Sequence, residues 1–315
     1  RVVGDMTKSR AYTLSSETSA TLGALDGDWQ IAVILSAPDA GVARQVDEVL
    51  ARIAECPTAD GHIRATRIDP TQPADAARYE AALETVQSRD ASALQQHAEA
   101  IRAGRAAFDR LTRVAAVQAP LLEDLVTALP ARDPARAELD ALRGGFVQLV
   151  IQKRAFDRSI DQLRSASDAR PFPDEARAAA AIAANLKHWS EELAAAARAL
   201  ADRAAQRVDS AALAAWLTGA PAEFTALARD LRVAQDGLDR LPKLWGAEVG
   251  AALAAGDCAI ITGPSGVATV PAWQLVAGAS GGSISFDRRF RGEQAIASAL
   301  RALKVGKPPV VVFVH

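Results

Sequence analysis

The chain has 315 residues, half of them hydrophobic, and a formal net charge of −2 at pH 7. This length suits two domains, and the near-neutral charge argues against nucleic acid or an anionic membrane surface as a partner. The two cysteines, Cys56 and Cys258, are too few for a disulfide framework, and they do not form a Cys-x-x-Cys pair.

The N-terminal part alternates helix and strand signals. Ser15 is expected to cap a helix that ends near Leu25. Residues 29–35 are continuously apolar, as in a strand covered on both faces. Residues 41–55 carry an apolar stripe with helical spacing, which predicts an amphipathic helix. Residues 61–69 contain two arginines and are expected to form a strand nearer the edge of the sheet.

A helical pattern begins after Pro73 and continues to about residue 246. Three segments within it repeat apolar residues at alternating steps of three and four, which is typical of long helices packed side by side. Pro120 is expected to kink or split the first helical stretch. Proline-rich breaks separate the segments at residues 130–134, 170–173 and 219–221.

Strand signals return after Gly256. Residues 258–263 are apolar and β-branched, and residues 267–276 can pair back on them as a hairpin. Pro271 cannot donate a hydrogen bond to a neighbouring strand, so we place its strand at an edge. A helix is expected over residues 291–306, and a final strand over 308–315.

Without the helical block the element order is β-α-β-β-β-α, the order of a thioredoxin-like core. The predicted class is therefore α/β plus all-α: a thioredoxin-like α/β domain interrupted by a long inserted helical bundle or coiled-coil arm. Residues 308–315 are either its last strand or the start of a following domain. The expected parts are the thioredoxin-like residues 1–73 and 247–307 and the inserted bundle 74–246.

Two tests follow from this topology. Residues 29–35 and 258–263 should be neighbours in one sheet, because each is apolar on both faces and needs a partner strand on both edges. Cys56 and Cys258 should lie at opposite ends of that sheet, so no disulfide should join them.

The turn after the first strand, Ser36-Ala37-Pro38-Asp39, stands where thioredoxins keep Cys-x-x-Cys. Gly256-Asp257 precede the third strand, where redox thioredoxins have a cis-proline. Because both elements of a redox site are missing, we expect no redox activity, and Asp39 is expected to cap the next helix. No catalytic, cofactor-binding or metal-binding residue is predicted. The four histidines lack the spacing of a metal site: 62, 97, 188 and 315.

Several polar residues could have a functional role, but each also has a simpler structural explanation. Lys153 on an apolar seam either fixes the register of the helices or extends its charged end outward, and we favour the second. Glu293 is explained by a place in the first turn of a helix, where a carboxylate is favourable. The Gly/Ser run 278–283 is interpreted as a loop rather than an anion cradle. The candidate contacts for a ligand or partner are Ser36, Asp39, Arg288, Arg289 and Arg291.

Short motifs in the two outer parts of the chain resemble gliding-motility-type ABC transporter auxiliary proteins, the GldG-like group. The family's second strand ends in Asp-Pro, as at Asp69-Pro70, and its next strand resembles residues 308–315. The resemblance covers residues 1–73 and 257–315 and leaves the helical block as a lineage-specific insertion. The remaining matching positions are Asp5, Thr7, Tyr12, Leu14, Ser15 and Thr18 at the start, and Phe290, Gly292 and Glu293 near the end.

The resemblance implies an inner-membrane helix just before Arg1, a domain on the extracytoplasmic (periplasmic) face, and association with ABC permease and ATPase subunits. It brings no catalytic residue and no cofactor. We therefore expect a non-enzymatic auxiliary or scaffold component of an ABC-type transport system, with the helical block as a docking element. The alternative is a solute- or glycan-binding domain with its ligand between platform and arm. Such a domain should have an enclosed, partly aromatic pocket, and the low aromatic content favours the scaffold.

Overall fold

The computed structural model describes residues 13–167, 171–276 and 290–305. These residues form two compact units. Unit 1 holds the described parts of residues 1–91, 167–172 and 244–315, and unit 2 holds 92–166 and 173–243. Most of the described chain is helical, and a small mixed sheet lies in unit 1, so the class is mixed α/β with high helical content.

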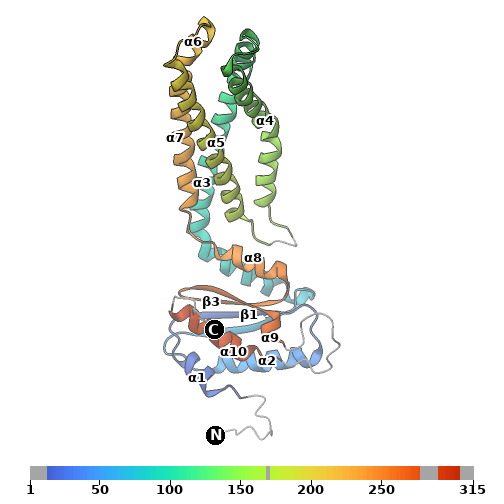
Figure 1. Cartoon of the computed structure of the whole chain (residues 1–315). Helices are drawn as coiled ribbons and strands as arrows, with labels where there is room; N and C mark the ends of the chain where they lie inside the picture. The colour runs from blue at the N-terminus through green and yellow to red at the C-terminus, as the bar shows by residue number, and fades with distance from the viewer. Residues whose placement is uncertain (1–12, 168–170, 277–289, 306–315) are drawn as a thin grey trace, which may run out of the picture. The chain divides into compact units, whose positions relative to one another are not determined.

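The sheet has four strands in the order β2-β1-β3-β4 (Figure 1). Strand β1 pairs in parallel with β2 on one side and antiparallel with β3 on the other, where Ile34 lies opposite Cys258. The prediction that residues 29–35 and 258–263 are neighbours in one sheet is confirmed. The strands are β1 (Trp29–Ile34), β2 (Ile63–Ile68), β3 (Cys258–Gly263) and β4 (Gly266–Pro271).

Burial along the strands explains their order. Every residue of β3 is buried, as are all but one in β1, because both are central strands. The outer strand β2 exposes Arg64, and its Arg67 pairs with Asp47 on the neighbouring helix. The other outer strand, β4, ends at Pro271, so the expected edge position of this proline is confirmed.

Apolar side chains cover both faces of the sheet, because successive residues of a strand point to opposite sides. Ile31 and Val33 face one cluster, and Ala32 and Ile34 face the other. The first cluster is completed by α1 (Ser16–Gly23), α2 (Ala40–Glu55), α9 (Ala272–Leu275) and α10 (Gly292–Val305). The second is completed by the start of α3 (Ala76–Ala128), by Phe172 and by α8 (Trp245–Ala255).

The predicted strand 267–276 is only half correct. Strand β4 ends at Pro271, and residues 272–275 form the short helix α9 instead. The N–H of Ala272 still donates to the carbonyl of Asp257 just before β3 (2.8 Å). The chain then turns into α9, where the N–H of Val276 donates to the carbonyl of Ala272 (2.9 Å).

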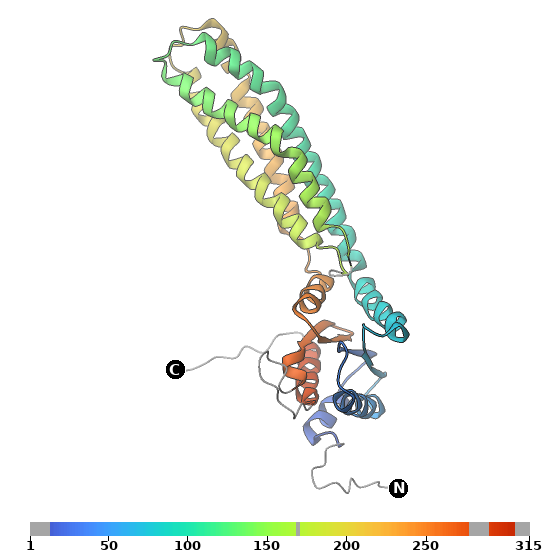
Figure 2. The same ribbon diagram turned by 90° about the vertical axis from the view of Figure 1, so that its right-hand side faces the viewer.

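Unit 2 is a bundle of long helices around a single apolar core (Figure 2). Residues on each predicted three-four seam are buried in that core, including Phe146, Leu186 and Leu231. Besides the later part of α3, the helices are α4 (Pro134–Leu163), α5 (Glu175–Ala204), α6 (Ala211–Leu217) and α7 (Ala220–Asp239).

Of the two effects expected of Pro120, a split does not occur: α3 continues past it to Ala128. One proline removes one backbone hydrogen bond, and packing can hold the helix across that gap. Ala119 and Leu122 on either side of it are buried in the bundle core. Among the described helices, none is both long enough and apolar enough to cross a membrane.

Candidate functional site

The turn after β1 is held by carboxylates from three parts of the chain. The backbone N–H and the hydroxyl of Ser36 both donate to the Asp257 carboxylate (N–Oδ1 3.1 Å, Oγ–Oδ1 2.8 Å). The N–H of Ala37, a residue in the left-handed region at φ +45°, donates to Asp69 Oδ1 (3.1 Å). Asp39 accepts from the N–H of Val42 (2.9 Å), so its predicted role as a helix cap is confirmed.

Asp69 also accepts two hydrogen bonds from Thr71, one from its hydroxyl (2.6 Å) and one from its N–H (3.0 Å). The hydroxyl bond is the largest cause that lowers the pKa of Asp69, and the N–H groups of Ala37 and Thr71 add to it, while burial opposes them. The carboxylate is thus ionised at neutral pH and joins the loop after β2 to the turn after β1.

The thiol at the start of β3 is not an activated nucleophile. Burial, and to a smaller extent the nearby Asp257, raises the pKa of Cys258 to about 11. The thiol is therefore protonated at neutral pH. Cys56 and Cys258 are both free, so the prediction that they are not bonded is confirmed.

Of the candidate contact residues, the structure describes Ser36, Asp39 and Arg291. The Ser36 hydroxyl donates to Asp257, and the Asp39 carboxylate caps the next helix. The backbone N–H of Arg291 donates to the carbonyl of Leu275 (2.6 Å). Within the described residues, no hydrogen bond or ion pair joins Ser36, Asp39 and Arg291 to one another. Arg288, Arg289, the Gly/Ser run, the predicted final strand and the motif positions Asp5, Thr7 and Tyr12 lie outside those residues.

Two of the resembling motifs meet in space. Glu293 Oε1 accepts from the backbone N–H of Ser15 (2.8 Å), and the Ser15 hydroxyl caps α1 through the N–H of Thr18 (3.1 Å). A Cβ at Gly292 would lie 2.4 Å from the ring of Phe290, so a larger residue there would displace that ring. The helix-dipole explanation of Glu293 is therefore incomplete, because its carboxylate also fastens the start of α1.

A groove of about 1070 Å³ runs between α4 and α5 in unit 2. Its floor includes Phe108 from α3, Leu149 from α4 and Leu193 from α5. Most of the other lining side chains are small, such as alanine, or polar but uncharged: Ala141, Gly145, Gln148, Gln152, Ala155, Ser159, Asn185, Ala195, Ala196 and Ala199. No sequence-based candidate lies in this groove.

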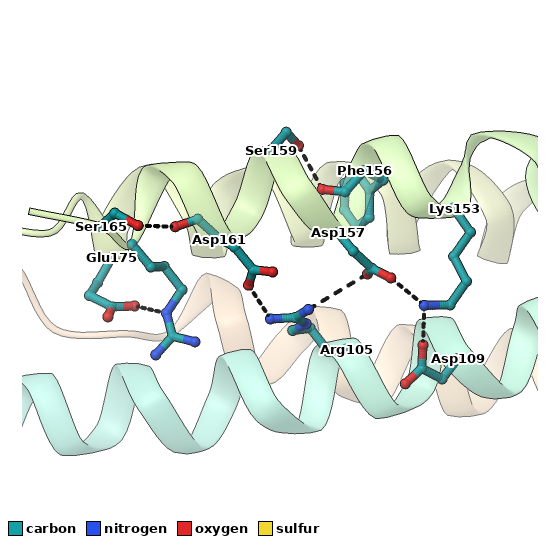
Figure 3. Close-up of polar contacts among 10 residues, drawn as sticks. Arg105, Asp109, Lys153, Phe156, Asp157, Ser159, Asp161, Ser165 and Glu175 are labelled. Atoms are coloured by element: carbon teal, nitrogen blue, oxygen red, sulfur yellow. Dashed lines mark hydrogen bonds and ion pairs between the residues drawn. The ribbon is translucent and has the colours of Figure 1, made fainter.

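A ladder of ion pairs ties α3 to α4 beside the groove (Figure 3). Arg105 contacts Asp161 (2.7 Å) and Asp157 (3.8 Å), and the ammonium of Lys153 contacts Asp109 on α3 (2.8 Å) and Asp157 on its own helix (2.5 Å). The preferred interpretation of Lys153, a charge extended into solvent, is wrong. The hydrogen bonds that the ammonium donates to Asp109 and then to Asp157 raise the pKa of Lys153, and the pair with Asp109 joins the two helices at one register.

No protein family, curated protein or solved structure matched the chain.

The described histidines, His62, His97 and His188, make hydrogen bonds or ring contacts. His97 is buried, and its Nε2 lies 2.8 Å from the carbonyl oxygen of Pro242. His188 packs its ring against Trp189 at the groove (centroids 5.4 Å apart), and His62 Nδ1 contacts the carbonyl of Gly61. In the described part of the chain, no group of three or more histidine, cysteine or acidic residues could hold a metal ion.

The sequence did contain a signal for the groove, which is one α4 face of small and polar residues at three- and four-residue steps. Residues 141, 145, 148, 152, 155 and 159 follow this rule. The same pattern is typical of an ordinary solvated helix face. Only the spacing between α4 and α5 in the folded bundle distinguishes a groove from an ordinary solvated face.

Proposed function

We propose that the chain is a non-enzymatic auxiliary component of an ABC-type transport system that acts through protein–protein contacts on the extracytoplasmic face. Its partners are the permease and ATPase subunits, and its anchor is a membrane helix before Arg1. The observation that carries the proposal is the contact of Glu293 with Ser15, because it unites two motif segments that resemble the GldG-like group.

The arrangement of unit 1 supports a thioredoxin-like domain with an insertion. Its strand order, with β1 and β2 parallel and β3 and β4 antiparallel to their neighbours, is that of a thioredoxin-like sheet. The chain on both sides of unit 2 belongs to unit 1. The two sides meet at Asp90, a residue 3% exposed, whose carboxylate accepts from the N–H groups of Trp245 (3.1 Å) and Gly246 (2.7 Å).

The turn after β1 supports a structural rather than a catalytic role. Its carboxylates accept hydrogen bonds from the turn itself, and the neighbouring thiol is protonated. The groove in unit 2 is instead a surface shape that suits contact with another protein.

The test is to express the full natural protein in its own host with an affinity tag, and to solubilise the membranes in mild detergent. The expected result is co-purification of a permease and an ATPase, with the tag accessible to protease from the periplasmic side. Recovery from the cytoplasm, or from membranes without either subunit, contradicts the proposal. A matched strain with Glu293→Gln should show weaker co-purification than one with the exposed neighbour changed, Gln294→Glu.

A further inference from the structure

The groove between α4 and α5 is a seam without polar contacts along its length, unlike the seams that α3 forms with α4 and with α7. Helices α3 and α4 share the ion-pair ladder, and α3 joins α7 through Arg110–Asp230 and through Gln118, which donates to Glu223 (3.0 Å). In contrast, no hydrogen bond or ion pair in the described structure joins residues 138–159 of α4 to residues 181–199 of α5.

The seam between α4 and α5 is closed at both ends. Arg164 pairs with Glu175 where α4 ends and α5 begins (2.8 Å), and Arg203 pairs with Asp133 at the opposite ends of the two helices (3.2 Å). Since the bundle core below is continuous, the separation between these ends is held by the fold. The groove is thus a preformed feature with fixed ends.

The lining is suited to close approach by another helix. Small residues leave room for a helix about 10 Å wide, as at Gly145, where an added Cβ would already lie 3.5 Å from the Trp189 ring. Phe156 and Trp189 are only half-buried, so each presents part of its ring to the groove. Ile151, 65% exposed, lies three residues after one lining residue and four before another, and therefore borders the groove.

The charge of the lining selects among occupants. Glu138 and Glu192 are its charged residues, both are exposed, and neither Lys nor Arg is among the side chains that line it. An occupant with basic side chains is therefore favoured by electrostatic complementarity. Two copies of this chain facing each other through the groove would bring acid to acid, which disfavours a second copy.

We propose that the α4–α5 groove binds an amphipathic helix of a partner protein, with Ala, Leu or other apolar residues on one face and Lys or Arg beside that face. This is the helix-in-groove mode of recognition, with anchors at three- and four-residue steps. The proposal rests on the proposed function only in taking the occupant from a protein partner. A permease or another subunit would present such a basic amphipathic helix to the groove.

The test uses the intact chain and synthetic helical peptides of about 22 residues, long enough to span ~33 Å. Four peptides carry Lys beside an apolar face of Ala, Leu, Met or Phe, and four twins carry Glu in place of Lys. Fluorescence anisotropy should show at least one Lys peptide binding at or below about 100 µM, with its Glu twin at least about 10-fold weaker. Failure of all eight peptides to bind overturns the proposal.

Two pairs of variants locate the binding. Ala155→Trp fills the groove and should abolish binding, whereas Ala116→Trp, on an exposed part of α3 outside it, should not. E138K/E192K should reverse the preference toward the Glu peptide, whereas E123K/D124K, with the same change in net charge on exposed α3 positions, should not. Equal effects of groove and control variants overturn the proposal. If circular dichroism shows that Ala155→Trp is not folded, the peptide preference of E138K/E192K alone decides whether the groove is the binding site.

A different occupant gives a different result. If the chain sediments as a dimer that Ala155→Trp dissociates, the groove serves a second copy and the partner-helix proposal is wrong. Failure to co-purify ABC subunits would contradict the proposed function but leave the peptide results unchanged, so the two proposals fail separately.

Discussion

The turn after β1 and the α4–α5 groove show opposite uses of carboxylates. At the turn, Asp39, Asp69 and Asp257 each accept hydrogen bonds from the backbone and side chains that they hold in place. In the groove, Glu138 and Glu192 make no hydrogen bond or ion pair in the described structure. The turn after β1 is thus occupied by structural contacts, whereas the unpaired carboxylates of the groove lie in unit 2.

The largest expected effect comes from removing unit 2. Replacing residues 92–243 by a short Gly/Ser linker should leave a folded sheet, because Asp90 bonds directly to Trp245 and Gly246 across the gap. Peptide binding should be lost completely. Stability should fall by about 3–5 kcal/mol, because the buried Phe172 ring leaves the second cluster. Circular dichroism and urea unfolding measure both. If unit 1 does not fold without unit 2, the turn after β1 depends on the unit that carries the groove, and the comparison of the two regions fails.

Exchange of single carboxylates tests the comparison directly. Asp257→Ala should destabilise the protein by about 1–3 kcal/mol, since two donors of Ser36 lose their acceptor. Glu192→Ala should change stability by less than about 0.5 kcal/mol, because that side chain is exposed. Urea unfolding at pH 7 gives both values. Equal destabilisation would mean that the groove carboxylate also has a structural role.

Loss of the ion-pair ladder should lower stability by a smaller amount, and it should also weaken peptide binding to the groove. Lys153→Met removes the contacts to Asp109 and Asp157 but keeps the aliphatic stem, and should cost about 1 kcal/mol because the pair is partly exposed. Binding of the Lys peptide should weaken as α4 shifts. Lys187→Met, at an exposed position of α5, is the control. Unchanged binding would show that the ladder does not position the groove.

The smallest effect is a dependence on pH at the turn. The pKa of Asp69 is lowered in the folded state, so its stabilising contribution is present above its unfolded value of 3.8 and disappears as pH falls through the lower folded value. The stability difference between the wild type and Asp69→Asn should therefore be constant from pH 7 to about pH 5 and shrink below about pH 4. A difference that grows on acidification would contradict this.

Much of the sheet could be predicted from the sequence because the burial of a strand is indicated by the apolar residues of that strand itself. Residues 29–35 and 258–263 are apolar on both faces, and this alone makes them central neighbours despite the long stretch of chain between them. Asp39 as a cap and Pro271 at an edge follow from the chemistry of one residue each. The seams of the bundle likewise follow from a repeat within each helix.

The missed features depend on distances between elements. Lys153 meets Asp109 only because α3 and α4 adopt one register, and Glu293 meets Ser15 only after both ends of unit 1 have come together. The small and polar face of α4 is present in the sequence, but it does not identify a groove because such faces are common on solvated helices. The continuity of α3 through Pro120 reflects packing around the proline, which overrides its local preference.

The pairing of β1 with β3 has a consequence for synthesis of the chain. At a ribosome that adds ~5–20 residues per second, β1 and β2 are made about ten seconds or more before β3 arrives. During that interval the apolar strand β1 has one unpaired edge, which is a template for aggregation. The helical unit, whose two segments are both made before β3, can fold in the meantime. A chaperone that shields nascent strands should therefore raise the soluble yield of this protein, and slower translation should lower it.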